Sequence, residues 1–227
     1  MKANRYTEII LFICIVFFMP ATAAEAEVDN YDYVLSSLFW DELYTFGGWS
    51  LYCGYWFESN KKTRSGKTVS IEHIYPTSWM FKQVGCESRM QCRESNNKRF
   101  ARMEADMHNM YPVWQALVTY RYDLSYGEIK GEEWRFDDCD FEWKRGIVEP
   151  RPLARGNIAR AIFYMYSKYG VLIKPEMINV LKAWNKEDPP SEQEKVRNDK
   201  IEKIQGRRNP YIDDPSLADQ ISIRAER

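Results

Sequence analysis

Histidine is scarce in this chain, and neither glycine nor proline is abundant. The 227 residues include two histidines, eleven glycines and ten prolines, and the formal net charge is −1. The modest glycine and proline content excludes a collagen-like or low-complexity chain. The near-zero charge argues against a protein that binds polyanions over its whole surface, so a polyanion site would have to be a local patch.

Several motifs of enzymes and metal proteins are also missing. The sequence has no His-Glu-x-x-His, no Gly-x-Ser-x-Gly and no Cys-x-x-Cys segment, and no internal repeat is visible. These absences argue against a zinc protease, an α/β-hydrolase, a paired-cysteine zinc site and a solenoid. Apolar residues nevertheless make up 44% of the chain and aromatic residues 15%. This composition supplies enough apolar surface for a folded core and excludes disorder as the main state.

The N-terminus carries a targeting pattern. Lys2 and Arg5 precede an apolar run of eleven residues, Ile9 to Met19, and small residues follow at 21–24. This order predicts a secretory signal peptide over residues 1–24. A transmembrane anchor is the alternative, but the run is too short to span about 30 Å of hydrocarbon. We therefore expect an exported protein, periplasmic or secreted, with no membrane segment after the signal is removed.

Four cysteines remain after that removal. In an exported protein they predict two disulfides, for which three pairings exist. The short spacing between Cys86 and Cys92 suits a small closed loop, and that pairing would leave Cys53 and Cys139 as a long-range link. A zinc site is the alternative, but it is disfavoured by the two histidines and the lack of a Cys-x-x-Cys pair.

The remaining pattern places strands mainly before helices. We expect strands over 49–57 and 68–74, loops over 60–67 and 127–145, and helices over 29–44, 99–110, 158–169, from Pro175 onward and from Ser191 towards Gly206. Helical spacing of apolar residues and end signals such as proline, serine and glycine support the helices. This order predicts an α+β domain, here residues 25–212. Residues 213–227 have few apolar side chains and are predicted to be a loose tail.

The two histidines lie in polar clusters. Glu72 and His73 come at the end of the predicted strand, and His108 follows Glu104 and Asp106. An imidazole can accept a proton near neutral pH, and a neighbouring carboxylate can hold a hard divalent cation. A Glu-His pair alone is more often structural or without a role, because so short a motif is weak.

Several further segments share a recognisable order with these clusters. They are Leu51-Tyr52-Cys53-Gly54, Glu72-His73-Ile74-Tyr75-Pro76, Arg89 three residues before Cys92, Phe100 through Pro112, Arg155 through Arg160, Tyr164-Met165, and Gln205 through Pro210. In this order the chain resembles the bacterial endonuclease I family of secreted or periplasmic, non-specific nucleases. The resemblance covers roughly residues 49–212, and the combination of motifs makes it specific.

The resemblance implies a ββα-metal core and hydrolysis of phosphodiester bonds in DNA, with RNA as a further substrate. His73 would be the general base that takes a proton from water. Glu72 would help to hold one Mg²⁺ ion, or Mn²⁺ or Ca²⁺ in its place. Arg89 would lie near the phosphate and stabilise the transition state, and Arg121 would support it.

The same resemblance implies supporting roles for other residues. Arg155 and Arg160, in the segment that matches the family's long helix, are candidates for substrate contact. Basic residues outnumber acidic ones over 151–208, which suits either a phosphate-facing patch or an ordinary solvated surface. His108 and Asn109 would hydrogen-bond to position the core rather than take part in chemistry. A compact domain of this size is expected to be a monomer.

One segment departs from the family pattern. There, an asparagine six residues after the proline is the other protein ligand of the metal, but that position here is Val118. Valine has no oxygen to offer a cation. Asp123, at the position of the family's second asparagine, is the predicted substitute, and Gln115 is a further candidate. The alternative function is therefore a degenerate family member with weakened or lost cleavage, which binds nucleic acid or a protein partner.

Overall fold

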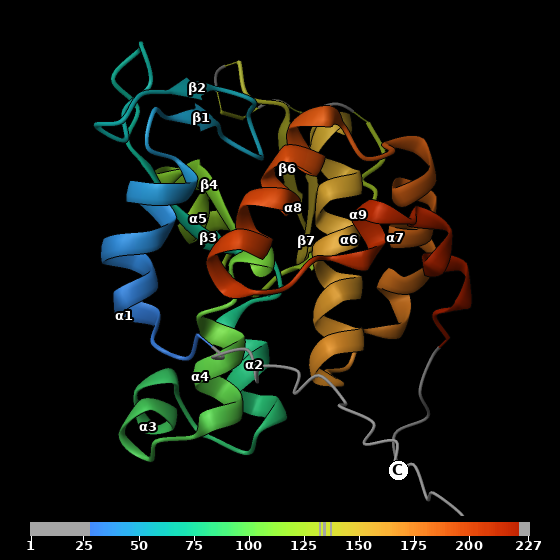
Figure 1. Cartoon of the computed structure of the whole chain (residues 1–227). Helices are drawn as coiled ribbons and strands as arrows, with labels where there is room; N and C mark the ends of the chain where they lie inside the picture. Colours follow the sequence, from blue (N-terminus) through green and yellow to red (C-terminus); the bar gives the residue numbers. More distant parts are fainter. Residues whose placement is uncertain (1–27, 132, 134, 137, 223–227) are drawn as a thin grey trace, which may run out of the picture.

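The computed structural model describes residues 28–131, 133, 135–136 and 138–222 (Figure 1). Helices and three small sheets together form an α+β fold, as the sequence predicts. The predicted signal peptide at 1–24 lies outside the described residues. Within the described ranges, no helix combines the length and the apolar character needed to cross a membrane.

The first described elements are a helix and a short hairpin. α1 (Tyr31–Tyr33) continues into the π-helix η1 (Val34–Leu43), and β1 (Gly48–Trp49) pairs with β2 (Trp56–Phe57). The single strand predicted over 49–57 is thus two strands joined by a turn. The turn contains Gly54 at φ +66°, and a Cβ there would lie 2.8 Å from the guanidinium carbon of Arg151. Only glycine allows this close approach without strain.

Two longer strands and a helix form the unit that carries both histidine clusters. β3 (Val69–His73) confirms the predicted strand and runs antiparallel to β4 (Met110–Trp114), with Glu72 opposite Tyr111. α5 (Gln115–Arg121) follows β4 and packs against both strands. The helix predicted over 99–110 is shorter, because α4 (Lys98–Glu104) ends before the 3₁₀ turn η2 (Met107–Asn109). The Asp106 side chain caps that turn by accepting from the His108 amide.

α2 (Thr77–Gln83), α3 (Arg89–Glu94) and α4 form a small group of helices at the lower end of the view in Figure 1. The Cys86–Cys92 disulfide joins the loop after α2 to α3. A three-stranded sheet in the order β5-β7-β6 uses β5 (Ser125–Tyr126), β6 (Phe141–Lys144) and β7 (Ile147–Pro150). The predicted loop over 127–145 therefore includes a strand. Cys53–Cys139 is the second disulfide, so both predicted pairings are confirmed.

The C-terminal part is helical, with α6 (Pro152–Tyr169) at its centre beside α7 (Pro175–Glu187) and α8 (Glu192–Gln205) (Figure 1). α9 (Pro210–Asp213) and the 3₁₀ helix η3 (Pro215–Gln220) follow. The chain from 213 to 222 is not the loose tail predicted from its composition. Its few apolar residues are well placed, since Ala218 and Ile221 are buried against the core. Residues 223–227 lie outside the described part.

Candidate active site

His73 ends β3 as a buried, neutral imidazole. Its Nε2 lies 2.8 Å from the carbonyl oxygen of Glu104. A carbonyl can only accept, so Nε2 carries the proton and Nδ1 keeps an open lone pair. Nδ1 has no partner among the described residues. Burial lowers the pKa of His73 to about 4, although the bond to Glu104 opposes that shift. The ring is therefore neutral at pH 7 and can accept a proton at Nδ1.

An aromatic ring and two arginines surround this imidazole. The Glu104 carboxylate accepts from Nε of Arg89 and, at 2.9 Å, from Nε of Arg93. The Tyr31 ring lies 5.5 Å from the His73 ring, 4.9 Å from the Arg89 guanidinium and 5.1 Å from that of Arg93. The Arg89 side chain is still 42% exposed. An accessible cation thus stands beside the imidazole, held by a tyrosine from α1.

Asn109 fixes the backbone that follows His73. Its Oδ1 accepts from the Tyr75 amide at 2.7 Å, and its Nδ2 donates to the Tyr75 carbonyl at 3.0 Å. The Ile74 amide also donates to the Asn109 carbonyl at 2.9 Å. These bonds join the start of β4 to the end of β3, which is the positioning role expected for Asn109.

Glu72 faces a different environment from His73, within the core. Its side chain has no hydrogen-bond partner in the described part of the chain, and the residue is 5% exposed. Burial raises the pKa of Glu72 to about 8, while the nearby Arg121 acts in the opposite direction. The hydroxyls of Tyr52 and Tyr126 lie 2.7 Å apart in the same cluster. Glu72 is therefore a desolvated carboxylate that lacks enough positive charge around it.

Arg121 lies at the end of α5, completely buried. Its Nη2 donates to the Ile74 carbonyl at 2.9 Å, and its guanidinium lies 4.2 Å from the centre of the Tyr126 ring. Since Arg121 has no exposed surface, its reach to a bound molecule is blocked in this conformation. Its contribution is to hold the end of β3 and to provide a cation near Glu72.

Few side chains near Glu72 could serve as ligands of a divalent cation. Across the described ranges, no group of three or more His, Cys, Asp or Glu side chains could hold a metal. Val118 packs half-buried against the core. The backbone amide of Gln115 donates to the carbonyl of Thr68, next to the far end of β3 and about 13 Å along the strand from Glu72. Gln115 is therefore too distant to share a cation with Glu72.

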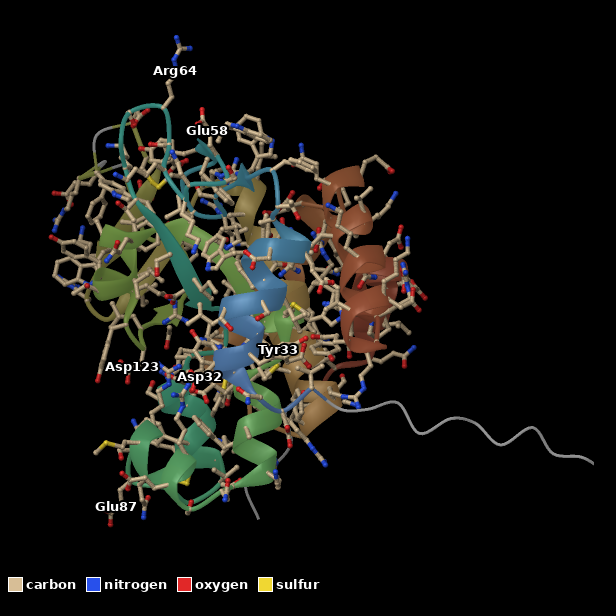
Figure 2. The ribbon with its side chains drawn as sticks, turned by 60° about the vertical axis from the view of Figure 1, so that its left-hand side comes forward. Asp32, Tyr33, Glu58, Arg64, Glu87 and Asp123 are labelled. Carbon is tan, nitrogen blue, oxygen red and sulfur yellow. A yellow bond between two sulfur atoms is a disulfide. The ribbon has the colours of Figure 1, made fainter. Side chains whose placement is uncertain are left out.

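Asp123 lies on the side of α2. Its Oδ2 is 3.5 Å from Ser78 Oγ, and its carbonyl accepts from Trp79 Nε1 at 3.2 Å. Figure 2 shows Asp123 at the level where the body of the molecule meets α2 and α3. No contact of Asp123 with Glu72 is present in the described part of the chain. Of the predicted metal ligands, Glu72 alone keeps free oxygens in a suitable position, and water or a bound anion would have to supply the other ligands of a cation there.

The two arginines of α6 are engaged inside the protein. Nε and Nη2 of Arg160 donate to the Glu194 carboxylate at 2.8 and 2.5 Å, and Arg160 is 1% exposed. Nη2 of Arg155 donates to Glu149 at 2.7 Å. Arg160 thus has no surface with which to contact a substrate, and that assignment is not retained. Arg155 is largely occupied by Glu149, so both arginines tie α6 to its neighbours.

Tyr31 and Arg93 are neighbours of the His73 site that sequence reasoning missed, and Glu104 was named there without its contact to His73. Tyr31 is separated from His73 by more than forty positions, and no local motif connects them. The one local signal is Asn30, whose side chain accepts from the Tyr33 amide at 2.9 Å and so begins α1. That cap predicts the start of a helix but not which ring the helix places over His73.

His108 is 1% exposed, and its titration should affect stability. Nε2 donates to the Arg207 carbonyl at 2.9 Å, while Nδ1 is buried with no partner in the described ranges. Burial lowers the pKa of His108 from 6.5 to about 4. The unfolded chain therefore binds the extra proton first, and the free energy of unfolding falls as the pH drops from 6.5 towards 4, by about 3 kcal/mol in total.

We expect the His108→Gln variant, which keeps a donor for Arg207, to lose less stability over this pH range than the parent. Urea unfolding at several pH values between 4 and 6.5 measures the difference. If the free energy of unfolding depended on pH equally in parent and variant, the assignment would be contradicted, because the pH dependence would then come from other groups.

A neutral imidazole with an open nitrogen, a partly exposed arginine beside it and a carboxylate without a hydrogen-bond partner lie together on the β3-β4-α5 unit of an α+β protein. The model of the family described as Endonuclease I matches residues 22–216. The chain therefore belongs to the endonuclease I family.

Individual relatives agree with this assignment. An extracellular deoxyribonuclease of Aeromonas hydrophila is 31% identical over 169 residues, which is 71% of this chain and 72% of the relative. A periplasmic deoxyribonuclease of the same organism is also 31% identical, over 71% of this chain and 69% of its own length. An extracellular ribonuclease of Bacillus amyloliquefaciens is 40% identical over 72% of this chain, but over 58% of its own length.

Proposed function

We propose that this endonuclease is exported, acts as a monomer and hydrolyses phosphodiester bonds of DNA without sequence preference, with RNA as a further substrate. The observation that carries the proposal is the tautomer of His73, whose Nδ1 is left free to accept a proton. The names of the relatives support the substrate and the exported location, and a divalent cation is expected as cofactor.

In this proposal Nδ1 of His73 takes a proton from the attacking water as the new bond to phosphorus forms. The bond from Nε2 to Glu104 holds the ring in that orientation and stabilises the positive charge that the ring gains. Arg89 turns from Glu104 towards the phosphate oxygens, and Arg93 keeps Glu104 paired. When bound at Glu72, Mg²⁺ or a similar ion would neutralise charge on the phosphate and on the leaving oxygen.

The degenerate alternative is not favoured. It rests on Val118, which removes one expected ligand. The structure keeps the other features of the site, namely a free Nδ1 on His73, an accessible Arg89 and an unpartnered Glu72. With one protein ligand, the expected consequence is weaker cation binding rather than loss of chemistry.

Plasmid cleavage by the oxidised mature protein tests the proposal. We expect nicked and linear products with Mg²⁺ or Mn²⁺ and none with EDTA. The Val118→Asn variant, which restores an amide oxygen, should reach half-maximal rate at a lower Mg²⁺ concentration than the parent. Folded protein that leaves the plasmid intact with every cation would overturn the proposed function, and equal rates with EDTA would overturn the cofactor.

Arg89 should matter more than its neighbour Arg93. Both bind Glu104, so they are a matched pair, but only Arg89 is assigned to the phosphate. We expect Arg89→Ala to lower kcat/KM about 100- to 1000-fold, because a donor to the developing charge is lost. Arg93→Ala should lower it by less than about tenfold. Initial rates on a labelled duplex measure both, and equal losses would reassign Arg89 to a purely structural role.

Tyr31 should support catalysis indirectly, through its contacts with Arg89 and His73. The Tyr31→Ala variant removes contacts with two guanidinium groups, each about 0.5–1 kcal/mol, so we expect the free energy of unfolding to fall by about 1–2 kcal/mol. Because Arg89 and the His73 ring also lose a fixed neighbour, we expect kcat to fall as well, by at most about 30-fold. Tyr33→Ala is the control, because Tyr33 lies on the same helix but is 52% exposed (Figure 2). Equal effects of the two substitutions would show that α1 as a whole, rather than the Tyr31 ring, supports the site.

A further inference from the structure

A second concave surface lies on the side of the molecule formed by β1, β2 and the first turns of α6 and α8. It is a groove of about 320 Å³, which we call the tryptophan groove. Figure 1 shows these elements at the upper end of the molecule, away from α2, α3 and α4. Neither His73 nor Arg89 lines it. Tyr111, which does, is the β4 partner of Glu72, so the groove begins one strand away from the proposed site.

Two tryptophans form an exposed aromatic wall of this groove. Trp49 and Trp56 face each other across the hairpin with ring centres 5.4 Å apart in an edge-to-face arrangement. They are 49% and 47% exposed, although tryptophan in a folded protein is usually highly buried. Leu153 and Val196, also exposed, continue the apolar surface on α6 and α8. Such flat, accessible rings are suited to stacking with a planar ligand.

The polar lining of the groove is positive. Arg151, Arg197 and Lys200 lie in it, and Glu194 is the single acidic residue among its lining. The Glu194 carboxylate is already paired with Arg160, as described above. Arg151 and Ser191, the residues that precede the first turns of α6 and α8, also lie here, so the positive dipole ends of both helices add to the field. The groove therefore favours an anionic group.

Arg197, one of the cations that line the groove, has a nitrogen without a hydrogen-bond partner. It is 8% exposed; its Nε donates to the Tyr44 hydroxyl at 3.0 Å, and its Nη2 donates to the carbonyls of Met107 and Met110. Its Nη1 is buried and has no hydrogen-bond partner within the described ranges. Buried guanidinium groups are normally satisfied, so this open donor leaves part of the Arg197 charge without a hydrogen-bonding acceptor, although the guanidinium also lies 4.0 Å from the centre of the Tyr111 ring.

From these observations we propose that the tryptophan groove binds a segment of single-stranded nucleic acid, with a base stacked on Trp49 and Trp56 and a phosphate facing Arg151 and Lys200. Aromatic rings interleaved with cations are the combination that binds single strands without sequence preference. The inference rests on the proposed function, because it adds a strand-holding surface to the same enzyme.

Binding can be tested separately from cleavage. The full mature chain carrying His73→Ala is titrated, in EDTA, against a labelled oligothymidylate of about twelve nucleotides, and fluorescence anisotropy gives the Kd. We expect Trp49→Ala and Trp56→Ala each to weaken binding about 5- to 150-fold, the range of one stacked base. Lys200→Glu should weaken binding too, and the number of phosphate contacts deduced from the salt dependence of the Kd should fall by roughly one. Thermal unfolding confirms that each variant is folded.

Trp143→Ala is the matched control, because Trp143 is a similarly exposed tryptophan on β6 outside the groove. It should bind within about twofold of the parent. Unchanged binding by both groove tryptophan variants would overturn the proposal, as would equal loss in Trp143→Ala. Equally tight binding of a blunt duplex that depends on both tryptophans would overturn the choice of a single strand. A dimer in sedimentation that Trp56→Ala abolishes would instead assign the surface to self-association.

These outcomes are distinct from failure of the proposed function. That function fails when the protein with His73 intact leaves plasmid uncut with every cation. The groove proposal fails when the tryptophan variants bind the oligonucleotide as the parent does, whatever the plasmid assay shows.

Discussion

The His73→Gln variant should fold normally and lose most of its cleavage activity. Glutamine keeps an N–H that can donate to the Glu104 carbonyl, which is the contact His73 makes through Nε2. It offers no basic nitrogen in place of Nδ1. General-base catalysis typically contributes about 10²- to 10⁴-fold, so we expect kcat to fall by that factor while the KM for DNA changes little. The measurement is a steady-state series at saturating Mg²⁺.

Two further variants separate chemistry from structure. His108→Gln replaces the other histidine, which donates to Arg207 and does not face the proposed site. It should keep cleavage near the parent level. His73→Ala leaves a space for added imidazole, which should restore part of the rate as it supplies the missing base. Full activity in His73→Gln, or rescue that is absent while the protein is folded, would contradict the role of Nδ1.

Local patterns in the sequence were sufficient for much of the fold. Pro175 and Ser191 mark helix starts that the structure places at α7 and α8, with the Ser191 hydroxyl accepting from the Glu194 amide. The strand ending at His73 and the Cys86–Cys92 loop also follow from short-range spacing. Caps, alternation and short loops are decided by neighbours in the chain, so they can be recognised without knowing the fold.

Interactions between distant residues could not be predicted in the same way. Arg160 matched a family segment and carries charge, which suggested substrate contact, but its environment depends on Glu194, thirty-four positions away. The helix over 99–110 was predicted too long because helical spacing continues past Glu104, whereas Asp106 bonds locally and redirects the chain into β4. Burial of a charged group is decided by its tertiary partners, which a single sequence does not reveal.

The two disulfides should differ in how much they stabilise the protein. Cys53–Cys139 closes a separation of 86 residues, and Cys86–Cys92 closes one of 6. The chain-entropy model then gives about 4.6 kcal/mol for the long link and about 2 kcal/mol for the short one. We expect the Cys53→Ser/Cys139→Ser protein to lose about twice as much unfolding free energy as the Cys86→Ser/Cys92→Ser protein. Urea unfolding of the three oxidised proteins measures this.

The long link should also affect the chemistry, because Cys53 directly follows Tyr52, whose hydroxyl contacts Tyr126 in the cluster around Glu72. Without the disulfide, the turn that holds Tyr52 is free to shift, and Glu72 loses the fixed surroundings that hold it in place as a cation ligand. We therefore expect a reducing agent to raise the Mg²⁺ concentration needed for half-maximal cleavage in the parent and in the Cys86→Ser/Cys92→Ser protein alike. The Cys53→Ser/Cys139→Ser protein should need that higher concentration even when it is kept oxidised. An unchanged Mg²⁺ requirement after loss of the long link would show that Tyr52 is held by packing against Phe141, 5.1 Å away, rather than by the disulfide.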